Sequence, residues 1–258
     1  MATCDVIYGS YNYVDQSETD IVGGSENAFY PASNLKEPRS TKVYRSTIAS
    51  DNVVFDFKSA VDIDLICVRP DLDDGWGFDN NLTIEANTID SWAAPAYTST
   101  LTVDHSYNFA ASILAATETY RFWRISGTAS SYFELSNIFI GAKFQAERNA
   151  SLNWNYYNND LSKQRENEDG QVFIDVRPQR KEIDYNIKVL TKSGFALLES
   201  ELDYLGKIKP LWLIMDNEEK FSNAYETFSG MFYVTRKSKY RNPAFGYYDT
   251  SLVLKEGR

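Results

Sequence analysis

The chain has 258 residues, of which 43% are hydrophobic and 15% aromatic, and its formal net charge is −10. The apolar content excludes a disordered chain, and the negative charge disfavours nonspecific binding to DNA or to anionic lipid. No apolar run approaches the roughly 20 residues that span a bilayer, so we expect neither a nucleic-acid partner nor membrane insertion.

The amino-terminal segment predicts a first short strand over residues 5–13, followed by a long polar connection. It has neither a basic n-region nor an apolar h-region, so we expect no secretory signal and synthesis in a reducing cytoplasm. Cys4 and Cys67 lie in apolar, strand-like surroundings. Two buried free thiols are the favoured interpretation, and a disulfide is the alternative.

Three strands are predicted over residues 42–46, 53–57 and 62–68, the last apolar enough to be buried on both faces. The next segment, RPDLDDGWGFDNN, is a conspicuous acidic loop. Its glycine falls one position short of the EF-hand pattern, so a solvated turn is one interpretation. The other is a calcium site, because clustered carboxylates suit a hard cation, with the ligands Asp71, Asp73, Asp74 and Asp79.

Aromatic side chains in two loops are the candidate binding residues. The acidic loop supplies Trp76 and Phe78, and the loop over residues 87–101 supplies Trp92 and Tyr97. An exposed ring can stack on a sugar or on a partner protein, whereas packing of each ring on its own sheet is the plainer alternative.

The stretch YRFWRISGTASSYFELSNIFIG predicts two strands, residues 120–126 and 133–140, joined as a hairpin by a Gly/Ser/Thr-rich segment. We expect Phe122, Trp123 and Phe133 to be buried in one sandwich core, because aromatic rings bury the most area per residue. Before this stretch, residues 106–116 are consistent with one helical turn.

Three blocks of the first half resemble discoidin-like (galactose-binding-like) jelly-roll domains. YRFWRI followed by FELSNIFIG is similar to the last two core strands of that family. YPASNLKEPRSTKVYRS and VVFDFKSAVDIDLICV resemble two of its earlier segments, in the same order. The resemblance implies a jelly-roll β-sandwich over residues 1–145 and leaves the ligand open.

The second half predicts longer, alternating strands over residues 172–176, 183–190, 210–216, 231–236 and 247–254. FALLESELDYL has apolar residues at near-helical spacing and is followed by Gly206 as a C-cap, which predicts one helix. The expected fold is therefore mainly β: an N-terminal jelly-roll β-sandwich, then a C-terminal β-sandwich or α+β domain with one helix over residues 146–258.

No recognisable active site is visible in the sequence. It has no phosphate-binding glycine loop, and one histidine, His105, is too few for a convincing triad or zinc site. We expect no enzymatic activity. Glycan hydrolysis by a carboxylate pair is the alternative, since sequence cannot place two carboxylates at a set distance.

The order of FALLESELDYL, KPLWLIMD and MFYVTRKSKY resembles tail-tip and baseplate proteins of tailed bacteriophages. That resemblance implies a structural virion component, assembled in the host cytoplasm as a ring or trimer, whose partners are other copies and other tail proteins. The basic segments 177–181 and 236–241 are expected to carry subunit contacts. The alternative function is a non-catalytic carbohydrate-binding module protein, for which a host surface glycan is the candidate partner.

Overall fold

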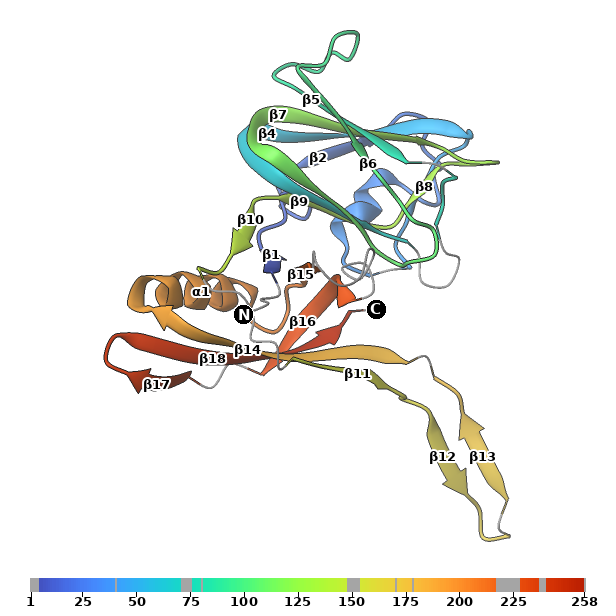
Figure 1. The fold of residues 1–258 in the computed structure, drawn as a ribbon. Coiled ribbons are helices and arrows are strands. Elements are labelled where there is room, and N and C mark those ends of the chain that lie inside the picture. The colour runs from blue at the N-terminus through green and yellow to red at the C-terminus, as the bar shows by residue number, and fades with distance from the viewer. Residues whose placement is uncertain are drawn as a thin grey trace. The chain divides into compact units, whose positions relative to one another are not determined.

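The computed structural model of the chain describes residues 5–39, 41–70, 76–79, 81–147, 154–169, 171–177, 179–216, 228–236 and 240–257. The chain forms two compact units (Figure 1). The sandwich unit comprises Ile7–Gln145, Trp212–Gly230 and Arg258, and the helix unit comprises Met1–Val6, Ala146–Leu211 and Met231–Gly257. Both are mainly antiparallel β, as predicted, and no described helix is long and apolar enough to cross a membrane.

The sandwich unit is organised around one strand, β4, which is 20 residues long. The main sheet has the order β2-β4-β7-β5-β6, with β9 also on β4, and β3 pairs with β8 in a separate sheet. The elements of this unit are β2 (Asp20–Gly23), η1 (Ala32–Lys36), β3 (Tyr44–Arg45), β4 (Ser50–Arg69), β5 (Leu82–Asn87), β6 (Tyr97–Leu101), β7 (Ala110–Thr128), β8 (Glu134–Leu135), β9 (Asn137–Gly141) and β10 (Lys143–Gln145).

Two further strands, β1 and β15, contribute most of their residues to the sandwich unit. β1 (Asp5–Gly9) pairs with β10 from Ile7 onward. β15 (Leu211–Asp216) carries Trp212, whose ring lies 6.2 Å from that of Phe109 and 6.0 Å from that of Phe139. All three rings are buried, which confirms the prediction of an apolar strand in PLWLIMD.

β4 joins the two strands predicted over residues 53–57 and 62–68 into one. It alternates buried and half-buried residues as far as Phe57, and from Leu65 to Arg69 every residue is buried, as predicted for the second segment. The pairing with β7 shifts register between Asp56 and Val61, where Lys58 has a φ of 65°. A bulge of this kind lets a strand bend without ending.

The predicted hairpin between residues 120–126 and 133–140 is wrong. β7 pairs with β4 and β5, β8 pairs with β3, and β9 pairs with β4. The helical turn predicted over residues 106–116 is also wrong from Ala110 onward, because β7 begins at that residue. Alternating apolar residues identify strands, but they do not identify each strand's partner.

The core of the sandwich unit contains Trp123 and Phe133, both fully buried as predicted. Phe122 is only half-buried, and the Arg121 guanidinium lies 4.6 Å from its ring centroid. The prediction for Phe122 fails because successive residues of a strand face opposite sides, so two neighbours cannot both enter one core. Cys67 is a buried free thiol, and Cys4 lies outside the described residues.

The helix unit contains an antiparallel sheet and the helix α1. The central strand of the sheet is β18, which pairs with β14, β16 and β17. β11 pairs with β14 on its other side. The elements of this unit are β11 (Asn155–Asn159), β12 (Lys163–Glu166), β13 (Val172–Asp175), β14 (Arg180–Thr191), α1 (Lys192–Leu205), β16 (Gly230–Arg236), β17 (Tyr240–Ala244) and β18 (Tyr247–Glu256).

The helix α1 confirms the one predicted from FALLESELDYL, and it begins three residues earlier than that segment. Thr191 is its N-cap and accepts a hydrogen bond from the Gly194 backbone N–H at 3.2 Å. Gly206 is its C-cap, with a positive φ of 57°, and donates its N–H to the carbonyl of Leu202. Leu198 and Leu205 are buried on the apolar face that the sequence pattern indicated.

Candidate functional site

A charged pair lies at the centre of the candidate site in the sandwich unit. β3 pairs with β8 so that Arg45 is directly opposite Glu134. The Arg45 Nε donates to Glu134 Oε2 at 2.5 Å. Burial lowers the pKa of Arg45, but the hydrogen bond and the charge of Glu134 outweigh it and the net shift is upward. The Arg45 guanidinium is therefore held in its charged form.

Two tyrosine rings enclose the guanidinium of Arg45. Its Cζ lies 4.4 Å from the ring centroid of Tyr30 and 4.3 Å from that of Tyr132, which are cation–π distances. The backbone fixes Tyr30 in place, because the Arg45 N–H donates to the Tyr30 carbonyl at 3.0 Å. The Tyr132 side chain is 40% exposed, so part of its surface faces solvent while Arg45 covers another part.

Arg45, Tyr132 and Glu134 border an open pocket of about 160 Å³, which we name the Arg45 pocket. It is smaller than the roughly 300–1,000 Å³ of sites that enclose drug-sized ligands, and a single small polar ring matches it better. Ser130, Ser131 and Asp79 are exposed at its edge, and Ser130 Oγ donates to Asp79 Oδ2 at 2.6 Å. The lining consists of Arg45, Trp76, Gly77, Phe78, Asp79, Ala129, Ser130, Ser131, Tyr132 and Glu134.

Backbone hydrogen bonds fix the segment that forms one wall of the Arg45 pocket. The Glu134 N–H donates to the Gly77 carbonyl at 2.8 Å, and the Asp79 N–H donates to the Thr128 carbonyl at 2.9 Å. Gly77 is required here, because a Cβ at this position would lie 2.3 Å from the Cβ of Glu134. The wall is therefore set by main-chain contacts rather than by free loop conformations.

Two of the four aromatic residues predicted to bind a ligand line the Arg45 pocket. Trp76 is half-buried, and its Nε1 donates to the Tyr107 carbonyl at 2.7 Å. Phe78 is 3% exposed, and its ring lies 6.2 Å from the ring of Phe133. Both rings pack edge-on against His105, whose Nε2 lies 2.9 Å from the Phe78 carbonyl. Phe78 therefore supports the pocket floor and offers little surface to a ligand.

The other two predicted aromatic residues are not among the pocket's lining residues. Trp92 is half-buried, and the Arg124 guanidinium lies 4.6 Å from its ring centroid. Tyr97 opens β6 and packs 6.0 Å from the ring of Trp123. Whether either contacts a ligand stays a prediction.

The predicted calcium site falls mostly outside the described part of the chain. Asp71, Asp73 and Asp74 are not among the described residues, and Asp79 is exposed and bonded to Ser130. Within the described residues no group of three or more His, Cys, Asp or Glu side chains could hold a metal ion. Calcium binding by the four aspartates stays a prediction.

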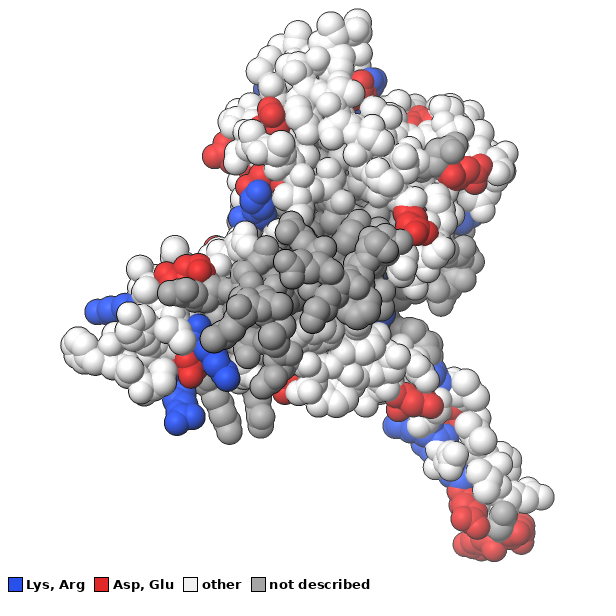
Figure 2. Space-filling model, in the orientation of Figure 1, with Lys and Arg blue, Asp and Glu red and all other residues white. Residues whose placement is uncertain are grey.

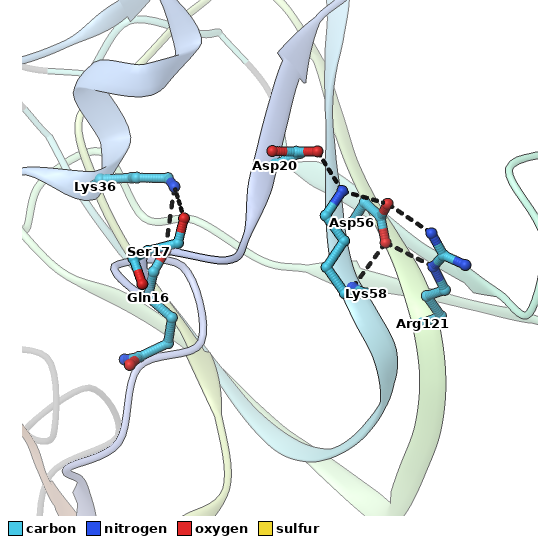
Figure 3. A network of polar contacts seen from close by, with 7 residues as sticks. All are labelled: Gln16, Ser17, Asp20, Lys36, Asp56, Lys58 and Arg121. Atoms are coloured by element: carbon cyan, nitrogen blue, oxygen red, sulfur yellow. Dashed lines mark hydrogen bonds and ion pairs between the residues drawn. The ribbon is translucent and has the colours of Figure 1, made fainter.

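A second polar cluster of the sandwich unit connects β2, β4 and β7 (Figure 3). Arg121 donates to both carboxylate oxygens of Asp56, at 2.7 and 2.9 Å. Lys58 also contacts Asp56, with 3.0 Å between Nζ and Oδ2, and it pairs with Asp20 of β2. These ion pairs bridge strands beside the β4 bulge, which makes their role structural.

Sequence reasoning missed the residues at the centre of the Arg45 pocket. Tyr30 and Arg45 lie in YPASNLKEPRSTKVYRS, and Tyr132 and Glu134 lie in or next to FELSNIFIG. Both blocks carried the jelly-roll resemblance, and that was the available signal. Pairing of the two blocks through β3 and β8 is what brings these residues together.

When the chain is compared with known proteins, the matches are to solved structures. No family model matches the chain, and no curated protein matches it. A family 32 carbohydrate-binding module from Clostridium perfringens NanJ, solved with galactose, is 12% identical, covers 55% of this chain and 98% of its own, and has a TM-score of 0.42. A Streptococcus pneumoniae fucose-binding module is 11% identical, covers 51% and 98%, and has a TM-score of 0.43. At these values the likeness carries no argument about the ligand of this chain.

Proposed function

We propose that the chain is a non-catalytic carbohydrate-binding protein whose sandwich unit holds a sugar residue in the Arg45 pocket. The observation that carries the proposal is the combination of the half-exposed Tyr132 ring with hydroxyl and carboxylate groups at the same edge. A sugar presents an apolar C–H face and a rim of hydroxyl groups. An aromatic surface beside a few placed polar groups matches both parts.

The charges in the pocket favour binding over hydrolysis. A glycosidase needs one carboxyl group that is protonated near neutral pH and can donate its proton. Glu134 is instead paired with Arg45, and Asp79 accepts a hydrogen bond from Ser130. The Glu134 carboxylate therefore serves as an anchor for Arg45.

Calorimetric titration of the full chain with galactose and with fucose, the sugars of the two solved modules above, tests the proposal. We expect one of them to bind, and Tyr132→Ala to weaken that binding by at least about tenfold, or about 1.4 kcal/mol. Trp92→Ala is the matched control, since it also removes a half-exposed aromatic ring of the sandwich unit. Equal binding by wild type and Tyr132→Ala, or loss only in Trp92→Ala, would contradict the assignment to this pocket.

The second candidate function is a structural component of a tailed-bacteriophage virion, at the tail tip or baseplate or as a minor tail protein, that assembles from copies of itself in the host cytoplasm. One observation supports an assembling protein: the helix unit carries an exposed apolar β-hairpin. Electron microscopy of the purified chain tests this candidate. Rings or trimers would support it. Monomers at all concentrations would contradict it, and sugar binding would then be the one remaining candidate function.

A further inference from the structure

The hairpin formed by β12 and β13 exposes apolar side chains that a folded protein ordinarily buries. All described residues of both strands are exposed, and in Figure 1 the two strands extend away from β11 and β14. Scattered exposed hydrophobic residues are common, but a contiguous group marks an interaction surface. The exposed fractions are 58% for Val172, 58% for Phe173, 57% for Ile174 and 80% for Val176.

The strand register divides these side chains between the two faces of the hairpin. Ile174 pairs with Gln164, and Val172 pairs with Glu166. Because side chains alternate along a strand, Val172 and Ile174 share one face of β13, and Phe173 lies on the other. Val172 and Ile174 therefore form a short apolar stripe on the first face, and the exposed Val176 follows the end of the strand.

Charge is segregated along the length of the hairpin. The tip carries Glu166 at the end of β12, and Glu168 and Asp169 in the turn that follows. Among the described residues of the stem, 161–165, 173–177 and 179–181, the acidic residue is Asp175, and it is bound to Arg177 at 2.6 Å. Figure 2 shows a group of acidic side chains at the tip and basic side chains along the stem, with acidic side chains among them at its upper end. The basic residues of the stem are Lys163, Arg165, Arg177, Arg180 and Lys181.

We propose that this hairpin binds a second copy of the chain, with the acidic tip of one copy against the basic stem of the other. Each hairpin carries both complementary charges, so two copies that lie antiparallel satisfy tip and stem at once. The same contact covers the apolar stripe. A two-stranded hairpin is marginally stable alone in water, and a second hairpin beside it supplies the missing burial. By itself this contact closes as a dimer, so it is one contact that an assembling chain could use, and it is independent of the sugar site.

Sedimentation velocity of the full chain over a concentration series tests the contact. We expect wild type to associate and the association to weaken in high salt, because exposed charges are screened. Two charge-reversed variants are then compared. The tip variant is Glu168→Lys with Asp169→Lys, and the stem variant is Arg177→Glu with Lys181→Glu. Each should be monomeric alone at concentrations where wild type associates, with at least about tenfold weaker association.

Mixing the two variants gives the decisive measurement. The reversed tip faces a reversed stem, and the native tip faces a native stem, so an equimolar mixture should associate when neither variant does alone. Glu18→Lys with Glu37→Lys is the control, since it changes the charge as much as the tip variant does, at exposed positions of the sandwich unit. Circular dichroism checks that each variant is folded.

Each outcome bears on a different claim. Rescue in the mixture supports the tip-to-stem contact. If all variants still associate, the hairpin contact is wrong, and self-assembly of the chain through another surface remains supported. A wild-type chain that stays monomeric at every concentration would overturn both.

Discussion

Arg121 and Asp56 form a two-pronged ion pair across neighbouring strands, with Nε–Oδ1 at 2.7 Å and a second guanidinium nitrogen 2.9 Å from Oδ2. The Arg121 hydrogen bonds, with those of Lys58, hold the pKa of Asp56 well below its usual range. An acid with a depressed pKa in the folded state contributes stability above its unfolded pKa, near 3.9. That contribution is lost as the pH falls through the folded value.

We therefore expect Asp56→Asn to lower the free energy of unfolding at pH 7, and the difference from wild type to shrink as the pH falls below about 4. Urea denaturation at pH 7 and pH 3 measures both values. Glu37→Gln, at an exposed position of the same unit, is the control. A difference that grows on acidification would contradict the sign of the pKa shift.

Trp123 is fully buried among core residues of the sandwich unit, with the rings of Tyr97 and Tyr120 about it. Trp123→Ala should reduce the free energy of unfolding by about 3–5 kcal/mol, as expected for a large-to-small core change. Trp92→Ala, which removes a half-buried ring, should cost much less. Equal effects of the two substitutions in denaturant titrations would show that the core assignment is wrong.

Gly77 leaves no room for a side chain, since a Cβ there would also lie 2.9 Å from the Glu134 carbonyl oxygen. Gly77→Ala should force β8 away from the pocket wall and destabilise the protein by about 1–3 kcal/mol, as overpacking does. Thermal unfolding measures the loss. Ser130→Ala is the comparison, because it removes one hydrogen bond without adding an atom, and a larger effect of that substitution would contradict the steric argument.

The calcium prediction has its own test. If Asp71, Asp73, Asp74 and Asp79 bind the ion, millimolar calcium should raise the melting temperature relative to a chelator, because a ligand that binds only the folded state stabilises it. Asp79→Asn should reduce that shift. Identical melting curves with calcium and with chelator would leave the loop as a solvated turn.

The sequence identified strands better than it identified their neighbours. β14, β15, β16, β18 and α1 lie where the apolar patterns predict them, because periodicity is a local property of the chain. The pairing of β7 with β4 is set by burial across distant segments, and no local pattern contains it. The predicted domain boundary between residues 145 and 146 stays a prediction.

The same limit applies to the candidate site. A tryptophan in a predicted loop indicates a binding surface, so the sequence predicts Trp76 and Trp92 as binding residues. Arg45 and Glu134 have no such local signal, because only the pairing of β3 with β8 brings them together. Their function as a site depends on a contact between positions far apart in the chain. The hairpin of β12 and β13 shows the opposite case, since the strand predicted over residues 172–176 lies there as β13, but its local pattern does not show that every residue of the strand is exposed.

The length of β4 has a consequence for how the chain is made. Phe55 pairs with Trp123, and Val68 pairs with Ile138. At about 5–20 residues per second of synthesis, β4 leaves the ribosome roughly 3 to 14 s before Trp123 of β7 and Ile138 of β9 exist. During that interval only the four-residue strand β2 is available to pair with it, and an apolar strand with one open edge is a template for aggregation. The nascent chain should therefore bind a holding chaperone through β4 and release it when β7 emerges.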